Sequence, residues 1–227
     1  AVTIALGFVQ VSSFVDLGIA SHLPGGGQTA LTFAAQLYTL PVSVFGLSVA
    51  ASSLPDFARD SIVAGDALRE RLRSGWSRIL FYIIPVTVVF IVYGDLVVDV
   101  FLRSGMFGAG DSRAVYRILA AYSIGLIGYT SVRLLASAFY AMQDYRAPLR
   151  ASGAAIATSA GLAVAFAWPL RDSPDPLGAA GIALGSALGS YVNLVLLAHG
   201  LRGRPGPLFT RAMWRGSARI VAATALA

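Results

Sequence analysis

The run ILAAYSIGLIGYTSVRLLASAFYAM, residues 118–142, contains a single charged side chain, Arg133. Its other ionisable groups are all tyrosines: Tyr122, Tyr129 and Tyr140. At about 1.5 Å per residue, a helix of this length crosses a hydrocarbon core of about 30 Å. A charge near the middle of such a helix costs about 2.5–3.5 kcal/mol on insertion scales. The run therefore predicts a transmembrane helix in which Arg133 faces a partner or a water-filled cavity.

The whole chain shares this apolar character. Of its 227 residues, 56% are hydrophobic and only 12% are charged, and the mean hydropathy is +0.72. Soluble domains carry about 25% charged residues. The composition therefore predicts an integral membrane protein, and the absence of cysteine excludes disulfides and thiolate metal sites within this chain.

Six complete apolar segments and part of a seventh follow one another along the chain. Only helices or closed barrels satisfy every backbone hydrogen bond in lipid, and segments of this length predict helices, so the fold class is an all-α membrane protein. Both ends of the chain lie inside apolar runs, which suggests a fragment of a longer, transporter-sized protein. The expected helices are about 2–21, 29–54, 79–102, 117–142, 149–170 and 177–201, followed by a connector and the start of a further helix within 202–227.

Arginine placement predicts the orientation. All 17 basic residues are arginine, and most lie in short connectors, so we interpret them as topology signals and expect no nucleic-acid binding. The second, fourth and sixth connectors are richest in arginine and should be cytoplasmic. Residues 61–77, SIVAGDALRERLRSGWS, could form an amphipathic helix on the inner membrane surface or a solvated linker helix.

Small residues and prolines predict how the helices pack. Gly181, Gly185 and Gly189 are four residues apart, on one helical face, in GIALGSALGS. This spacing allows two helices in lipid to approach closely, so we expect close packing against a neighbour such as 149–170. Pro41 and Pro85 lie inside apolar runs and should kink or break their helices.

Four more polar side chains lie within the predicted spans. Asp16 could contribute to a cation site or a polar cavity, or simply reach the outer interface. Gln10 and Asn193 could line the same cavity or form hydrogen bonds between helices. Gln36 lies at the start of the inner part of the second span.

Arg133 points to an anionic substrate, because a guanidinium pairs with phosphate or carboxylate through two parallel hydrogen bonds. The alternative for Arg133 is an internal salt bridge. His22 and His199 are isolated and lack metal-ligand spacing, and no serine or aspartate has a base at motif distance. A transporter is therefore expected rather than an enzyme, with no catalytic residue, no metal and no cofactor.

Three stretches resemble the MurJ (MviN) family of lipid II flippases, within the MOP superfamily that includes the MATE exporters. They are FVQVSSFVDLGIASHL (8–23), LYTLPVSVFGLSVAASSLPDFAR (37–59) and AAYSIGLIGYTSVRLLASAFYAMQDYRAPLR (120–150). The most specific part is AFYAMQDYRAP, with Phe139, Tyr140, Asp144 and Pro148. The resemblance implies that residues 1–201 are the second six-helix lobe of such a flippase, with the N-terminal lobe absent from this chain.

The resemblance also implies roles for individual residues. Arg133 matches a basic position that lines the central cavity and attracts lipid-linked pyrophosphate, and Asp16 matches a position that resembles a sodium ligand in some relatives. Gln36 stands where well-studied relatives have an arginine thought to contact substrate, and Ala163 stands where an amide is usual.

By this resemblance, the protein would flip lipid II, the lipid-linked peptidoglycan precursor, across the bacterial cytoplasmic membrane by alternating access. Its expected partners are the undecaprenyl-pyrophosphate-linked substrate, membrane lipids and the N-terminal lobe, and a coupling ion or the membrane potential could drive it. Two alternatives remain open: a MOP-type flippase or exporter for another substrate, and a cell-wall scaffold that does not transport.

Overall fold

The computed structural model describes residues 12–23, 26–47, 65–103, 107–171, 173 and 177–201, and all regular structure within these ranges is helical. The predicted all-α fold is thus confirmed. The elements are a helix over 12–20, α2 (Gly27–Pro41), the π-helix η1 (Val42–Leu47), α4 (Gly65–Val92), α5 (Gly94–Leu102), α6 (Ala109–Ile124), α7 (Leu126–Ala141), α8 (Arg146–Ala167), the 3₁₀ turn η2 (Trp168–Leu170) and α9 (Leu177–Leu201).

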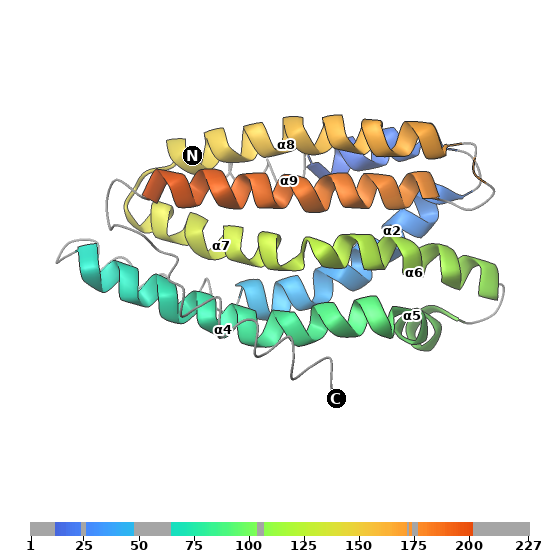
Figure 1. Ribbon diagram of the computed structural model, residues 1–227, viewed down its shortest axis with the longest axis horizontal. Helices are drawn as coiled ribbons and strands as arrows, with labels where there is room; N and C mark the ends of the chain where they lie inside the picture. The colour runs from blue at the N-terminus through green and yellow to red at the C-terminus, as the bar shows by residue number, and fades with distance from the viewer. Residues whose placement is uncertain are drawn as a thin grey trace.

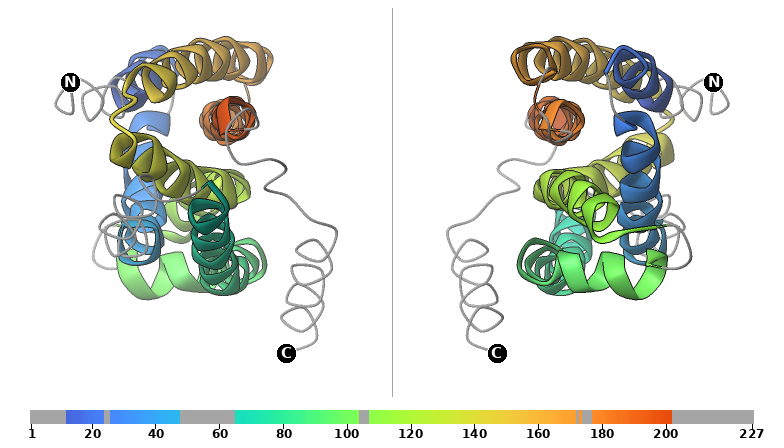
Figure 2. Two further views of the ribbon diagram at one scale, coloured as in Figure 1. Left: turned by 90° about the vertical axis from the view of Figure 1, so that its left-hand side faces the viewer. Right: turned by 90° about the vertical axis from the view of Figure 1, so that its right-hand side faces the viewer.

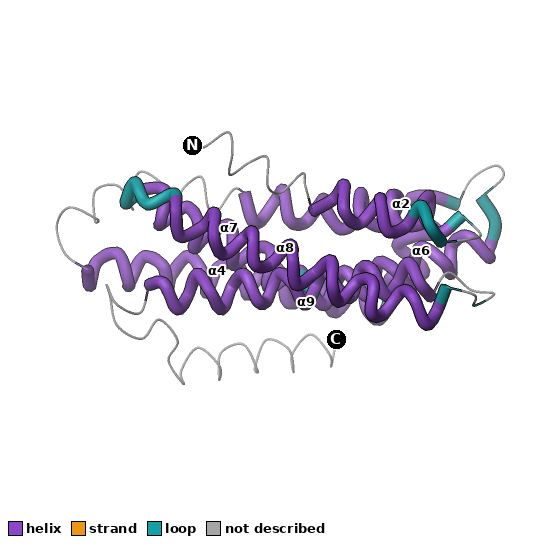
Figure 3. The backbone as a smooth tube through the Cα atoms, turned by 90° about the horizontal axis from the view of Figure 1, so that it is seen from above, coloured by secondary structure: helices purple, strands orange, loops and turns teal. Residues whose placement is uncertain are grey.

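The long helices run along one axis of an elongated bundle (Figure 1, Figure 3). The helices α8 and α9 lie side by side along one flank of the bundle, and α4 lies along the opposite flank. Between them are α6 and α7, with α2 crossing behind (Figure 1, Figure 2). This arrangement places α7, which carries Arg133, inside the bundle.

Two predicted helices are interrupted in the structure. The segment predicted as one helix over 79–102 is divided at Tyr93 into α4 and α5, and α4 starts at Gly65. Residues 65–77, which the sequence placed in a separate interface helix or linker, are therefore the first part of α4. The helix continues through Pro85, so of the kink or break predicted at this proline, the break does not occur. By contrast, the α-helical hydrogen-bonding pattern of α2 ends at Pro41 and continues as the π-helix η1.

The segment predicted over 117–142 is a bent pair, α6 and α7, which meet at Gly125 at an angle of 44°. The cause is a close approach of α9. A Cβ atom added at Gly125 would lie 2.8 Å from Ala187 Cα, a separation that real side chains do not show. The bend at Gly125 therefore lies where the backbones of two helices meet.

Three described helices are long and apolar enough to cross a membrane: α4 from Glu70, α8 together with η2, and α9. The bent pair α6 and α7 makes a fourth if it counts as one span. This is fewer than the six predicted spans. Within the described residues, α2 is only 15 residues long before η1 begins, and the helix over 12–20 begins at the edge of the described chain.

The two ends of the bundle separate the two predicted sets of connectors. The start of α4, the end of α7, the start of α8 and the end of α9 lie together at one end (Figure 1). The starts of α2, α6 and α9 and the end of α8 lie at the other end (Figure 1). The fold thus brings together the connectors that the arginine distribution assigns to one side.

The cysteine-free chain allows this topology to be tested by thiol labelling. We expect Gly110→Cys to react with a membrane-impermeant maleimide added outside the cell, because residue 110 belongs to the predicted external end. A Cβ at Gly110 meets nothing within 4 Å, so the change is tolerated. Gln143→Cys should react only after the membrane is opened, and equal external labelling of both variants would contradict the orientation.

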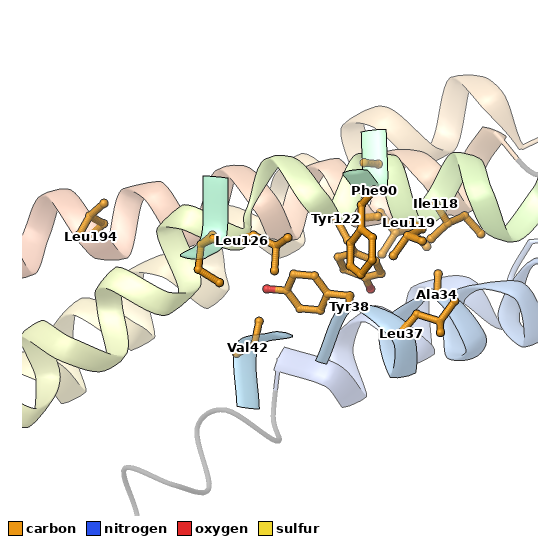
Figure 4. Close-up of a cluster of buried hydrophobic side chains, with 14 of the residues drawn as sticks. Ala34, Leu37, Tyr38, Val42, Phe90, Ile118, Leu119, Tyr122, Leu126 and Leu194 are labelled. Atoms are coloured by element: carbon orange, nitrogen blue, oxygen red, sulfur yellow. The ribbon is translucent and has the colours of Figure 1, made fainter. Parts of the chain in front are cut away.

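The buried core lies where α2, α4, α6, α7 and α9 meet, and it includes Phe90, Leu119 and Leu126 (Figure 4). Tyr38 of α2 projects into this cluster toward α6 and α7 (Figure 4). On the outside, α4 and α5 expose large apolar side chains such as Phe81 and Val100. Such an exposed apolar surface is expected of a protein whose solvent is lipid.

Candidate functional site

Arg133 lies on α7 one helical turn after Tyr129, and it is half-buried. The Tyr38 ring from α2 stacks on Tyr122 of α6, with centroids 5.1 Å apart, and contacts Tyr129 edge-on at 5.4 Å. Because Arg133 is one helical turn from Tyr129 on α7, the guanidinium belongs to the same part of the bundle as this aromatic cluster, which three helices contribute.

The predicted alternative for Arg133 was an internal salt bridge. Among the described residues, ion pairs join Arg73 to Glu70 and Arg103 to Asp99, and neither includes Arg133. Arg133 therefore remains a candidate for binding an anion.

Asp16 is buried, and it does not reach the outer interface as one prediction allowed. Its Oδ2 accepts a hydrogen bond from Ser186 Oγ of α9 at 2.6 Å. Its Oδ1 is buried and has no hydrogen-bond partner among the described residues. A buried carboxylate oxygen without a partner is costly, which makes Asp16 a candidate for binding a cation, a proton or a water molecule.

Tyr129 lies on α7 one helical turn before Arg133, and Asp16 is held separately by Ser186 of α9. The sequence indicated the charged residues, but not the serine that holds Asp16, because Asp16 and Ser186 are far apart in the chain.

The remaining predicted polar residues lie elsewhere. Gln36 is exposed on α2, whereas Tyr38, two residues later, is buried and stacks on Tyr122. Asn193 is half-buried between α8 and α9, where its Nδ2 donates to Ser152 Oγ at 3.4 Å and its Oδ1 is buried without a partner among the described residues. Gln10 lies outside the described residues.

The glycine face of α9 packs directly on α8, as predicted. A Cβ at Gly185 would lie 2.5 Å from the backbone nitrogen of Ala163, and one at Gly189 would lie 2.6 Å from Ser159 Cβ. Gly181 meets the backbone of Phe166 at 2.9 Å. The buried Ala163 thus lies at a point of backbone-to-backbone contact, where its small size suits the packing.

The motif AFYAMQDYRAP forms the turn between α7 and α8. The Asp144 N–H donates to the Phe139 carbonyl at 2.9 Å, and the Gln143 N–H donates to the Tyr140 carbonyl at 3.0 Å. These two bonds define a Schellman ending, and Gln143 occupies its left-handed position with φ 57°. The motif therefore has a structural role in closing one helix and starting the next.

The same motif also caps the start of α8. Asp144 Oδ1 accepts from the backbone nitrogens of Arg146 and Ala147 at 3.2 and 3.3 Å, and Pro148 lies in the first turn, where a missing N–H is tolerated. Phe139 is buried, and its ring lies against Gly200 of α9. The motif thus fixes the joint geometry of α7, α8 and α9.

We expect opposite stability effects from two changes in this turn. Gln143→Gly should stabilise the protein by about 1 kcal/mol, because glycine adopts positive φ without steric cost. Asp144→Ala should destabilise it by about 1 kcal/mol, because two N–H groups lose their acceptor. Melting temperatures of the full-length variants in detergent measure both. A rise for Asp144→Ala would contradict the capping geometry.

The comparisons with known proteins agree with this architecture. The family model described as "Lipid II flippase MurJ" matches residues 1–227. The chain belongs to this family. It is 29% identical over 213 residues to a probable lipid II flippase MurJ of Rhizobium meliloti (strain 1021), covering 90% of this chain and 38% of that protein.

Further MurJ relatives give the same picture. The chain is 30% identical to a probable lipid II flippase MurJ of Rhizobium tropici, covering 84% of this chain and 34% of the relative. It is 29% identical to the lipid II flippase MurJ of Burkholderia cenocepacia, and the match covers 89% of this chain and 38% of that protein. The chain therefore spans about two fifths of the length of the MurJ relatives it matches.

A solved structure shares the fold. A lipid II flippase MurJ in an inward closed conformation superposes with a TM-score of 0.83 over 98% of this chain and 44% of that chain, at 20% sequence identity. Together, the MurJ family membership and the long apolar helices show a multi-pass protein of the bacterial cytoplasmic membrane. The resemblance seen in the three sequence motifs is thus confirmed.

Proposed function

We propose that this chain is the second six-helix lobe of a protein that moves lipid II, the lipid-linked peptidoglycan precursor, from the inner to the outer leaflet. The observation that carries the proposal is Arg133, a half-buried guanidinium that pairs with no carboxylate among the described residues. The family's printed name supports lipid II as the substrate.

In this proposal, Arg133 binds the pyrophosphate of the substrate. A guanidinium donates two parallel hydrogen bonds to phosphate oxygens, and its charge offsets theirs. The Tyr129 hydroxyl, one helical turn away, could donate to the same anion. The apolar surfaces of the helices leave the polyprenyl tail in the bilayer while the headgroup crosses within the protein.

We propose that transport follows alternating access between this lobe and an N-terminal lobe of similar size. Bending at Gly125 would change the direction of α7 and thus the position of Arg133. The protein would move its substrate without altering it.

Asp16 is our candidate for the coupling of transport to a cation, because its Oδ1 is buried without a described hydrogen-bond partner. The apolar Ala163 offers no ligand where an amide is usual. The membrane potential is a separate source of energy, worth about 2.3 kcal/mol per charge per 100 mV, and it would act on the charge of Arg133.

We expect Asp16→Asn to remove any effect of a sodium gradient on flipping while the effect of membrane potential persists. The substitution removes the charge and keeps a side chain of nearly the same shape, with an oxygen that can still accept from Ser186 Oγ. Flipping by the full-length protein in vesicles, with each gradient imposed separately, measures both effects. A sodium effect of unchanged size in Asp16→Asn would exclude Asp16 as the coupling site.

One observation favours a second candidate function, a cell-wall scaffold that does not transport. Gln36 stands at an exposed position of α2 where transport-competent relatives are thought to use an arginine. Expression of the full-length gene in a flippase-depleted bacterium separates the two functions. We expect growth to be restored. Failure to restore growth despite normal membrane insertion would favour the scaffold.

A further inference from the structure

The short helix α5 differs in direction from the rest of the bundle. Only Tyr93 separates the start of α5 from the end of α4 at Val92. The helix α5 runs across the bundle axis, so it is seen end-on in Figure 1 and from the side in Figure 2. The 18 residues of α4 from Gly75 to Val92 contain one charged side chain, Arg78, and are about 27 Å long at 1.5 Å per residue. This length nearly crosses a core of about 30 Å, so α5 begins close to the level at which the hydrocarbon ends.

The turn into α5 is held by contacts with α6. The Tyr116 hydroxyl donates to the Ile91 carbonyl at 2.8 Å, which satisfies one of the carbonyls freed at the end of α4. A Cβ at Gly94 would lie 2.9 Å from the Tyr116 ring. A larger residue at position 94 would require the Tyr116 ring to shift, so the close start of α5 against α6 depends on this packing.

Three different faces surround α5. Gly94 and Val98 are buried against the protein. Leu96, Val100 and Phe101 are 58, 81 and 65% exposed. The third face is polar: it carries the exposed Asp95 and the half-buried Asp99, and Asp99 Oδ2 accepts a hydrogen bond from Arg103 Nη1 at 2.9 Å. A helix with protein, apolar and charged faces suits a boundary between lipid and water.

We infer that α5 is an interfacial helix whose Leu96, Val100 and Phe101 enter the boundary between headgroups and acyl chains of the outer leaflet, with Asp95 and Asp99 turned to water. Phospholipid is the occupant because the exposed face continues the apolar surface at the end of α4, where Val92 and Tyr93 are 55 and 52% exposed. Tyrosine side chains such as Tyr93 are enriched at this depth.

This placement fixes the depth of the outer end of the bundle. Because α5 joins α4 directly and contacts α6 through Tyr116, lipid contact at Val100 and Phe101 would hold both helices at one level of the bilayer. The inference rests on membrane insertion and not on the proposed substrate, so it can be tested without a transport assay.

Depth-dependent fluorescence quenching provides the test. In the full-length protein freed of other cysteines, a single cysteine replaces Val100 or Phe101. A single cysteine in place of Asp95, on the same helix, is the matched control. Each variant is labelled with a small environment-sensitive fluorophore and reconstituted in vesicles of phosphatidylethanolamine and phosphatidylglycerol. Lipids with a spin label near the headgroup or near the chain end act as membrane quenchers, and iodide acts as the aqueous quencher.

We expect probes at 100 and 101 to be quenched at least twofold more by the shallow spin label than by the deep one, and only weakly by iodide. The probe at 95 should show strong iodide quenching and little quenching by either lipid. Strong iodide quenching at 100 and 101 would overturn the inference by placing this face in water. Absence of quenching by every agent would overturn it by showing that the N-terminal lobe covers the face.

Discussion

Arg133→Ala should reduce lipid II flipping at least about 30-fold, while the protein still inserts and folds. Truncating one partner of a buried charge pair costs about 2–5 kcal/mol, and the low end of that range corresponds to about this factor. Folding should survive because no described carboxylate is left unpaired and because removing the charge relieves an insertion cost. Flipped substrate per folded protein measures the effect.

Two further variants sharpen this prediction. Arg133→Lys should keep part of the activity, because lysine retains the charge but loses the two-pronged geometry. Arg113→Ala, the same change at an exposed position on α6, should leave flipping unchanged. If Arg133 serves only a structural role, Arg133→Ala should instead lower the amount of folded protein, and the activity of each folded molecule should stay normal.

Gln36→Arg tests whether the exposed face of α2 contributes to the same cavity. It should partly restore flipping in Arg133→Ala if that face meets the substrate between the two lobes. The structure makes this a demanding test, since Gln36 is exposed, whereas Tyr38 is the α2 side chain that packs against Tyr129, one turn from Arg133.

Gly185→Leu should destabilise the protein by at least about 3 kcal/mol, the upper part of the usual range for overpacking. Even a single Cβ at this position would lie 2.5 Å from a backbone atom of α8, and the backbone cannot rotate away as a side chain could. The helices α8 and α9 must therefore separate to admit a leucine. The melting temperature and yield of the full-length protein in detergent report the loss.

Gly161→Leu is the matched control for this change. Gly161 lies on α8, within the same helix pair, but a Cβ there meets nothing within 4 Å. We expect wild-type stability from this variant, or a small gain from better helix propensity. Equal melting temperatures for Gly185→Leu and Gly161→Leu would show that α8 and α9 do not pack through this face.

Some elements could be predicted because their cause is local. The helix 177–201 has the predicted bounds, since apolar residues are continuous between two breaks rich in proline and glycine. The close packing of its glycine face also follows from spacing alone. In both cases the signal lies within one segment of the chain.

The breaks at Tyr93 and Gly125 have a different origin. The apolar composition continues through both positions, so nothing local marks a change of direction. The approach of Ala187 to Gly125 and of Tyr116 to Gly94 decides these bends, and such contacts appear only when distant segments meet. The sequence therefore predicted one long helix where tertiary packing makes two.

In the candidate site too, some features could be predicted from the local sequence, and others depend on tertiary contacts. Composition identified Arg133 and Asp16, because charged groups within apolar runs are conspicuous. It could not identify Ser186 as the donor to Asp16, or Tyr38 as the ring that stacks on Tyr122, since these contacts join segments far apart in the chain. Nothing in the sequence indicated that Tyr38, Tyr122 and Tyr129 form a cluster, because they lie on three different helices.

Movement of lipid II across a vesicle membrane tests the central proposal most directly. The purified full-length protein is reconstituted with fluorescent lipid II in one leaflet, under an imposed membrane potential and sodium gradient, and an impermeant quencher reports which leaflet holds the label. We predict that lipid II reaches the opposite leaflet with the wild-type protein and at least about 30-fold more slowly with Arg133→Ala, while a labelled phospholipid stays in place. Lipid II that remains in its original leaflet, in vesicles that contain folded wild-type protein, would contradict the account.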